Sequence, residues 1–154
     1  MTQVDFYHLL ASPLEVALPG LLEKALEKDM RAVVMTTSRE RATHLDGALW
    51  TYRKESFLPH GCVGQARNVE HQPVWIADSD DNPNGARLLV LVDRADSDNI
   101  DAFERVADMF DGHDDAAVAA ARRRWKARRD AGHVLNYWQQ TPRGTWEKKA
   151  STAA

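Results

Sequence analysis

The chain has 154 residues, 44% hydrophobic and 28% charged, which predicts one globular domain large enough to fold without a metal or a disulfide. No apolar run approaches the roughly 20 residues of a membrane-spanning helix, and the N-terminus lacks the basic and apolar segments of a signal peptide, so we expect a cytoplasmic protein with no membrane partner. The net charge of −3 excludes a surface that attracts nucleic acid everywhere, and Cys62 is the one cysteine, so no intrachain disulfide can form.

The first forty residues predict a strand, a helix and a second strand. Aromatic and aliphatic residues over 4–10 predict a short strand. Leucine and alanine side chains fall on one stripe over 20–29, which predicts an amphipathic helix with Pro19 in its first turn. The uninterrupted apolar run at 31–37 is typical of a strand that is covered on both faces.

The middle of the chain predicts a second helix and two further strands. Residues 37–40, TSRE, match a capping box with Thr37 as the N-cap, so a helix should begin here and end near Trp50. The apolar segments 73–78 and 87–94 predict strands, and a polar turn rich in Asp, Asn and Gly separates them.

The C-terminal half predicts two helices and a short strand. Segment 97–110 places its large apolar side chains at helical spacing, and segment 114–132 predicts an alanine- and arginine-rich helix that Gly132 should end. The tail contains one β-like piece and then frays, so we expect a domain over 1–138 and a partly flexible extension over 139–154. The order of elements indicates an α/β domain around a mainly parallel sheet.

The residues after the first predicted strand disfavour nucleotide chemistry. An α/β sheet that binds a dinucleotide needs a glycine-rich turn there, and this chain contains neither Gly-x-Gly-x-x-Gly nor Gly-Lys-Ser/Thr. A nucleotide-using enzyme is therefore the weakest of three functional hypotheses, and no cofactor is expected.

His60 and Cys62 are the residues that could carry catalytic or metal chemistry. They lie two positions apart and could share one side of an extended segment, but no third orienting group is evident. The six histidines are scattered singly, without zinc-ligand spacing. We expect instead that His60 hydrogen-bonds to the backbone of a turn and that Cys62 is an inert small hydrophobe.

Two stretches favour binding over catalysis. Residues 48–62 mix large apolar side chains with charges, which suits a surface that docks another protein. Residues 122–129 carry six positive charges in eight positions, which suits an anionic partner, although a solvated helix face is the alternative. A second functional hypothesis stays open, in which this helix binds single-stranded nucleic acid directly and Trp125 or Trp138 stacks on bases.

Four stretches, in this order and at these distances, resemble the chi subunit of bacterial DNA polymerase III: FYHLL, LDGALWTYRKESFLPHG, PVWIA and AARRRWKARRDAGHVLNYW. The resemblance runs from Val4 to Tyr137, and its most specific element is LDxxLW at 45–50 followed by SFxPH at 56–60. It implies a three-layer, Rossmann-like α/β fold without a nucleotide-binding loop. It also implies an accessory subunit of the clamp-loader assembly that is not an enzyme.

The resemblance implies that the arginine-rich helix holds the acidic C-terminal tail of single-stranded-DNA-binding protein. That tail ends in Pro-Phe with a free carboxylate, for which Arg122 is the expected bidentate partner. Trp125 is expected to line the slot for the terminal ring. The implied tail-binding residues are Arg122, Trp125, Lys126, Val118, Arg129 and Gly132. The other basic residues of the helix, Arg123, Arg124 and Arg128, are expected to steer the acidic tail at long range.

A second implied surface binds the psi subunit or, in some bacteria, a repair helicase. Its expected residues are Trp50, Arg53, Phe57, Pro59 and His60. Trp50 and Phe57 should be exposed in the isolated chain, and Arg53 departs from the proline that better-known members can carry. Phe57, Leu58 and Pro59 could instead close the sheet edge, and Leu58 is expected to be a core residue. The chain is thus expected to act as a monomer or heterodimer that reaches DNA only through protein partners.

Overall fold

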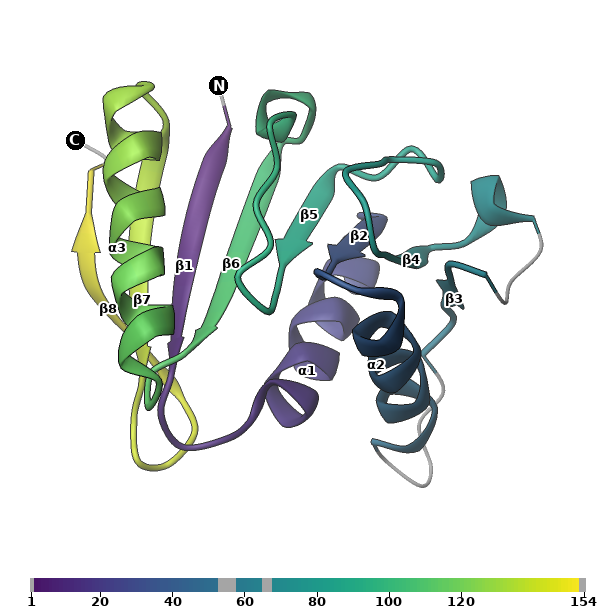
Figure 1. Ribbon diagram of the computed structural model, residues 1–154, viewed down its shortest axis with the longest axis horizontal. Helices are drawn as coiled ribbons and strands as arrows, with labels where there is room; N and C mark the ends of the chain where they lie inside the picture. The colour runs from purple at the N-terminus through teal and green to yellow at the C-terminus, as the bar shows by residue number, and fades with distance from the viewer. Residues whose placement is uncertain (1, 53–57, 65–67, 153–154) are drawn as a thin grey trace.

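The computed structural model describes residues 2–52, 58–64 and 68–152. Within these residues, eight strands form one sheet in the order β3-β4-β2-β5-β6-β1-β7-β8 (Figure 1). The strands are β1 (Gln3–Leu9), β2 (Ala32–Met35), β3 (Gly61–Cys62), β4 (Val74–Ala77), β5 (Leu88–Leu91), β6 (Arg105–Asp111), β7 (Val134–Gln140) and β8 (Trp146–Ser151). The helices are α1 (Leu14–Glu27), α2 (Arg39–Thr51) and α3 (Asp115–Asp130). Neighbouring strands are parallel, except that β8 runs antiparallel to β7.

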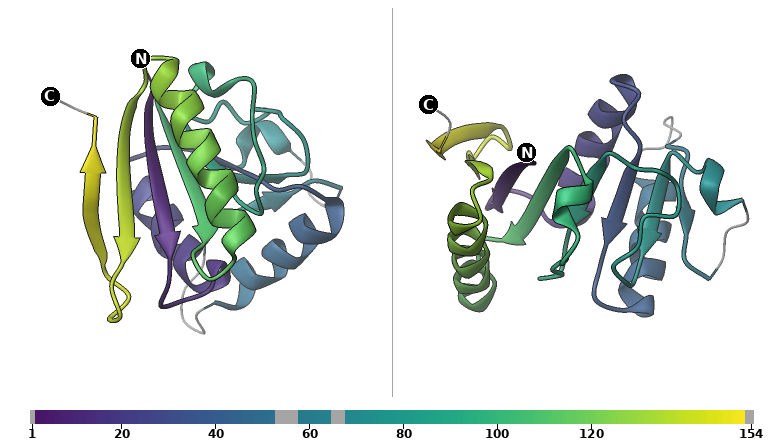
Figure 2. Two further views of the ribbon diagram at one scale, coloured as in Figure 1. Left: turned by 60° about the vertical axis from the view of Figure 1, so that its left-hand side comes forward. Right: turned by 90° about the horizontal axis from the view of Figure 1, so that it is seen from above.

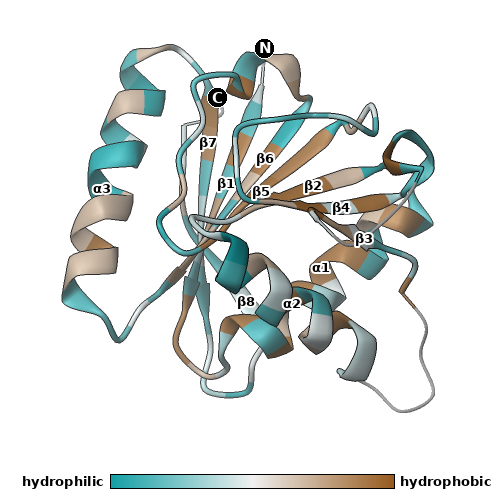
Figure 3. Ribbon diagram, turned by 45° about the vertical axis from the view of Figure 1, so that its right-hand side comes forward, coloured by the Kyte–Doolittle hydropathy of each residue, from teal (hydrophilic) through white to brown (hydrophobic). Residues whose placement is uncertain are grey.

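The helices pack on both faces of the sheet. α1 and α2 share a buried core with one face, and α3 joins the core on the opposite face, where it lies over β6, β1 and β7 (Figure 2). The strands β2, β4 and β5 are strongly hydrophobic (Figure 3). This arrangement confirms the predicted three-layer α/β fold with a mainly parallel sheet. None of the helices in the described ranges is long and apolar enough to cross a membrane.

Helix α1 begins earlier than the sequence predicts. It starts at Leu14, so Pro19 lies inside the helix instead of in its first turn. Proline has no N–H to donate to the carbonyl of Glu15, and one intrahelical hydrogen bond is therefore missing. Pro19 is buried together with Leu18 and Leu22, and this burial offsets the lost hydrogen bond.

The N-cap of α2 is Ser38, one residue after the predicted Thr37. The backbone of Ser38 is extended (φ −152°, ψ 157°), and its hydroxyl accepts a hydrogen bond from the backbone N–H of Arg41 at 3.1 Å. The helix ends at Thr51, close to the predicted end at Trp50. Its buried side chains are Ala42, Leu45 and Leu49.

The predicted helix over 97–110 is wrong. This segment forms a short 3-10 turn, Ile100–Ala102, followed by strand β6, which lies between β5 and β1 in the sheet. All residues from Val106 to Phe110 are buried, because a central parallel strand is covered on both faces. A run of buried residues fits a covered strand as well as a helix, so the position in the fold decides between them.

The C-terminal segment forms a hairpin instead of a fraying tail. β7 continues to Gln140, and β8 returns along it as the edge strand of the sheet. Hydrogen bonds between Thr141 and Thr145 close the turn, where Gly144 adopts a left-handed conformation (φ 83°) that suits glycine. The predicted extension 139–154 therefore includes the end of β7 and the whole of β8.

Candidate protein-docking surfaces

Helix α3 has capping features at both ends, and Gly132 is the one that the sequence predicts. The Asp114 carboxylate accepts hydrogen bonds from the backbone N–H groups of Ala116 and Ala117 at 3.0 and 3.3 Å. Alanines dominate the first turns, and basic residues in the last turn interact favourably with the helix dipole. Gly132 has a φ of 88° and follows the last turn, where a left-handed residue ends a helix.

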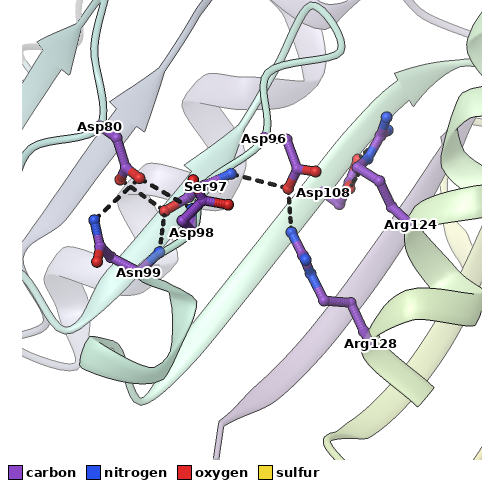
Figure 4. A network of polar contacts seen from close by, with 8 residues as sticks. All are labelled: Asp80, Asp96, Ser97, Asp98, Asn99, Asp108, Arg124 and Arg128. Atoms are coloured by element: carbon purple, nitrogen blue, oxygen red, sulfur yellow. Dashed lines mark hydrogen bonds and ion pairs between the residues drawn. The ribbon is translucent and has the colours of Figure 1, made fainter. Parts of the chain in front are cut away.

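Arg124 points from α3 into the core. Its Nε and Nη2 groups donate hydrogen bonds to the Asp108 carboxylate at 2.6 and 2.9 Å, and both side chains are buried (Figure 4). Because Asp108 lies on β6, this ion pair ties α3 to the centre of the sheet. The predicted steering role of Arg124 is therefore wrong, since Asp108 neutralises its charge inside the protein.

Arg128 also has a partner within the chain. Its guanidinium forms an ion pair with Asp96, whose carboxylate also accepts a hydrogen bond from the N–H of Ser97 (Figure 4). Asp80 binds the same loop by accepting three hydrogen bonds from residues 97–99. Arg128 therefore holds α3 against this loop.

The other four cations of the segment face outward. Arg122, Arg123 and Lys126 are exposed, and none of them forms an ion pair with a residue in the described ranges. Arg129 is exposed as well, with its guanidinium 3.6 Å from the neighbouring Asp130. An exposed pair of this kind contributes little, so these four side chains are the charges available to a partner.

Aromatic side chains lie beside Arg122. The half-buried Trp125 ring meets the rings of Phe6 and Tyr137 edge-on, at centroid distances of 5.3 and 5.8 Å. Val118, one of the predicted tail-binding residues, is half-buried against the same core. Trp125 is thus partly a core residue, and its accessible part adjoins the outward cations.

His8 and Tyr137 complete this cluster, and sequence reasoning missed both. The His8 Nδ1 and the Tyr137 hydroxyl are hydrogen-bonded at 2.5 Å. Burial lowers the pKa of His8, and the positive charges of Arg122 and His113 lower it further. The alternation within FYHLL already placed Phe6 and His8 on one face of a strand, but only the parallel pairing of β1 with β7 brings Tyr137 beside them.

The second predicted surface surrounds Trp50, near the end of α2. Trp50 is 51% exposed, which confirms its predicted exposure, and its ring lies 4.5 Å from the ring of His60. Pro59, which precedes His60 in the chain, is half-buried. Arg53 and Phe57 lie outside the described residues.

The buried His60 ring packs against the exposed Trp50 ring. The His60 Nδ1 lies 2.7 Å from the carbonyl oxygen of Leu58, so the ring N–H donates to the backbone as the sequence predicts. Its Nε2 lies 3.0 Å from Asp46 Oδ1, a distance typical of an ion pair, but without the angles of a hydrogen bond. The two halves of the motif that carries the family resemblance therefore meet through Asp46, Trp50 and His60.

Cys62 is unsuited to nucleophilic catalysis. Burial, together with the nearby charge of Asp46, raises the pKa of its thiol to about 11, so the reactive thiolate is scarce near neutral pH. Within the part of the chain that the structure describes, no three His, Cys, Asp or Glu side chains are grouped in a way that could hold a metal ion.

Parallel α/β sheets that bind nucleotides do so at the carboxyl ends of their strands. In this chain, ion pairs between side chains of the protein lie at that edge. A groove of about 660 Å³ lies at the carboxyl ends of β1 and β6. Arg41 forms ion pairs there with Asp93 at 2.9 Å and with Glu15 at 3.4 Å. Arg94 pairs with Asp114 at 2.7 Å. The guanidinium groups that could bind a phosphate at this edge are thus already paired with carboxylates of the protein.

The sequence comparisons identify the family. The model of the family described as "DNA polymerase III chi subunit, HolC" matches residues 1–136. The chain belongs to the DNA polymerase III chi subunit family. Chi is a subunit of DNA polymerase III other than the catalytic one, so this chain is a replication accessory protein.

Three proteins named as DNA polymerase III subunit chi are similar to this chain, and each alignment covers most of the relative's length. The "Probable DNA polymerase III subunit chi" of Rickettsia prowazekii (strain Madrid E) is 27% identical, over 97% of this chain and 93% of the relative. The DNA polymerase III subunit chi of Pseudomonas aeruginosa is 31% identical, over 88% of this chain and 94% of the relative. The DNA polymerase III subunit chi of Escherichia coli (strain K12) is 34% identical, over 69% of this chain and 71% of the relative.

Proposed function

We propose that this chain is a non-catalytic adaptor that holds the acidic C-terminal tail of single-stranded-DNA-binding protein on α3. Arg122 is the observation that carries the proposal: it is exposed, forms no ion pair within the described residues, and adjoins the aromatic cluster around Trp125. A tail that ends in phenylalanine with a free carboxylate needs this combination, because the ring requires apolar contact and the carboxylate requires a forked donor.

The outward charges of α3 support an acidic ligand. Arg123, Lys126 and Arg129 lie on the exposed side of the same helix as Arg122. Aspartates that precede the end of the tail would be attracted by this cluster, and the attraction would weaken as salt is added.

We further propose that Trp50 anchors a second protein, either a psi subunit or a repair helicase. An exposed tryptophan is a common hot spot of protein interfaces. His60 fixes the position of the Trp50 ring from the buried side. In this arrangement, the chain would connect the tail on α3 to a replicase or helicase bound near the end of α2.

Direct binding of single-stranded nucleic acid by α3 is the alternative, and it has weaker support. Arg124 and Arg128 are engaged with Asp108 and Asp96, so they are not available to phosphates. The Trp125 ring is packed edge-on against core rings, which limits the open face on which a base could stack.

One binding experiment tests the adaptor and its alternative together. The chain is immobilised, and three analytes are compared: single-stranded-DNA-binding protein, the same protein without its C-terminal tail, and a bare oligothymidine. An adaptor binds the first analyte and neither of the others. Binding of bare DNA with equal strength would reject the adaptor in favour of direct nucleic-acid binding.

A further inference from the structure

A second large groove lies on the face of the sheet opposite α3. It has a volume of about 830 Å³, within the range of ligand-binding clefts, and every residue that lines it is described by the structure. One wall is α1, the floor comes from β1 and β7, and the other wall is the turn between β7 and β8. In Figure 2 the β7–β8 hairpin forms the outer end of the sheet, on the far side from α2.

The floor of the groove is a ladder of side chains from three adjacent strands. Tyr7 on β1 pairs in register with Trp138 on β7, which pairs in register with Lys148 on β8. The Tyr7 and Trp138 rings are nearly parallel with centroids 6.5 Å apart, and the Lys148 Nζ lies 5.1 Å from the Trp138 ring centroid. Trp146 adds an edge-on contact to Tyr7 at 5.0 Å. The Tyr7 ring and the Lys148 ammonium group thus both lie against the Trp138 ring.

The α1 wall is apolar and open. Val16 is 64% exposed, which is unusual for a large apolar side chain, and Leu21 lies half-buried five residues further along. Gly20 lies between them, and a Cβ atom placed there would meet no atom within 4 Å. A glycine at this point lets another backbone approach α1 closely.

The charged side chains that line the groove are all positive. Lys24 and Arg143 line it, Lys148 borders it, and its lining contains no acidic residue. None of these three cations forms an ion pair with a described residue, although the chain as a whole has a net charge of −3. An apolar groove with unpaired cations at its rim is complementary to an apolar stripe flanked by acidic side chains.

We propose that this groove docks an amphipathic α-helix of a partner protein, with acidic residues flanking its apolar stripe. Such a helix would lie beside α1 and extend the helix layer of α1 and α2 over β1 and β7, at the usual separation of about 8–10 Å between helix axes. Single-stranded nucleic acid fits less well, because bases stack on open aromatic faces and the Trp138 ring already has Tyr7 and Lys148 against it.

The proposed groove is independent of the two surfaces in the proposed function. Trp138, Arg143 and Trp146 lie beyond residue 136, where the match to the chi family model ends. The groove is therefore built partly from a segment outside that match, and its partner need not be one that the whole family shares.

The test uses two synthetic helical peptides of about 18 residues, or roughly 27 Å of helix, with the same apolar stripe. One peptide carries glutamates beside the stripe and the other carries lysines. Binding to the ¹⁵N-labelled chain is followed by the indole N–H signals of its five tryptophans. We expect the acidic peptide to shift Trp138 and Trp146 and to leave Trp125 unchanged, and we expect the basic peptide to bind at least about tenfold more weakly.

Two variants make the test specific. Val16→Asp changes an exposed side chain, so it should leave folding intact and weaken the acidic peptide at least about tenfold. The double variant Lys24→Glu with Arg143→Glu should reverse the preference between the two peptides. Lys149→Glu, whose exposed side chain does not line the groove, is the matched control and should change neither.

Several results would overturn the proposal. These are no shift of Trp138 and Trp146 with the acidic peptide, equal binding of both peptides, or an unaltered preference in the double variant. A shift of the same two signals by oligothymidine alone would assign the groove to nucleic acid. Sedimentation showing a dimer of the chain that Val16→Asp dissolves would assign it to a second copy.

Discussion

The Arg124 guanidinium and the Asp108 carboxylate form a buried ion pair with two hydrogen bonds. Arg123, which directly precedes Arg124 on α3, is exposed. This relationship divides the basic segment of α3 into side chains that hold the fold together and side chains that can meet a ligand. A charge run in a sequence does not reveal this division, because it depends on which residue of the helix faces β6.

The first prediction concerns stability. Arg124→Ala should lower the free energy of unfolding by about 3–5 kcal/mol, because it leaves the Asp108 carboxylate buried without a partner. Arg123→Ala should change it by less than about 0.5 kcal/mol, since that side chain is exposed and unpaired within the described residues. Urea unfolding followed by tryptophan fluorescence measures both.

The matching control replaces the whole pair. Arg124→Met combined with Asp108→Val should recover most of the lost stability, because these apolar side chains have a combined volume close to that of the ion pair and need no partner. Equal unfolding midpoints for Arg124→Ala and Arg123→Ala would contradict the structural role of Arg124.

The second prediction concerns pH. Burial lowers the pKa of His8, so the imidazole takes up a proton less readily in the folded state than in the unfolded state. The stability that this shift provides is present above the unfolded pKa of about 6.5 and is lost as the pH falls below it. The stability of the parent chain should therefore decrease more between about pH 7 and pH 5 than that of His8→Gln.

The titration of His8 can also be measured directly. Its Cε1 proton should titrate in the folded chain with a midpoint below about 6.5 in NMR spectra. A midpoint at or above that value would show that burial and the charge of Arg122 do not act on this imidazole as described.

The third prediction concerns Cys62. Because burial raises the pKa of its thiol to about 11, an aromatic disulfide reagent at about pH 8 should label the native chain only slowly. The same reagent should label the chain quickly in denaturing urea, where the thiol is solvated. Rapid labelling of one thiol in the native state would indicate that Cys62 is accessible and reactive.

The fourth prediction distinguishes the binding role of Trp50 from the structural role of His60. Trp50→Ala should abolish binding of the psi subunit or helicase that docks there, at a cost below about 1 kcal/mol in stability, because the ring is half-exposed. His60→Ala should cost about 1–3 kcal/mol in stability, because it removes a buried hydrogen-bonding group. The reverse ranking of the two stabilities would mean that Trp50 is a core residue.

Most of the fold could be predicted from the sequence, because apolar periodicity and turn residues specify local structure. The strand at 4–10, the helix of α3 and the role of Gly132 follow from such local signals. The segment 97–110 was misassigned, because its buried residues satisfy both periodicities and only its place between β5 and β1 makes it a strand. The hairpin turn was missed, although Gly144 provided a signal for it.

The candidate sites were predictable only in part. The resemblance to the chi family indicated Arg122 and Trp125, and helical spacing places the two residues near each other on one helix. It could not indicate His8 and Tyr137, which join them from β1 and β7 by parallel strand pairing. It also could not show that Arg128 is held by Asp96, because that contact links two segments 32 residues apart.

The measurement that tests the central claim most directly is a double-mutant cycle on the tail carboxylate. A fluorescent peptide ending Asp-Asp-Ile-Pro-Phe is titrated with the parent chain and with Arg122→Ala, once with a free C-terminal carboxylate and once with an amide. We predict that Arg122→Ala and amidation each weaken binding by about 2–5 kcal/mol, and that the amide adds almost no further loss in the variant. Equal affinity of the parent chain and Arg122→Ala for the free-carboxylate peptide, or full additivity of the two changes, would contradict the assignment of the carboxylate to Arg122.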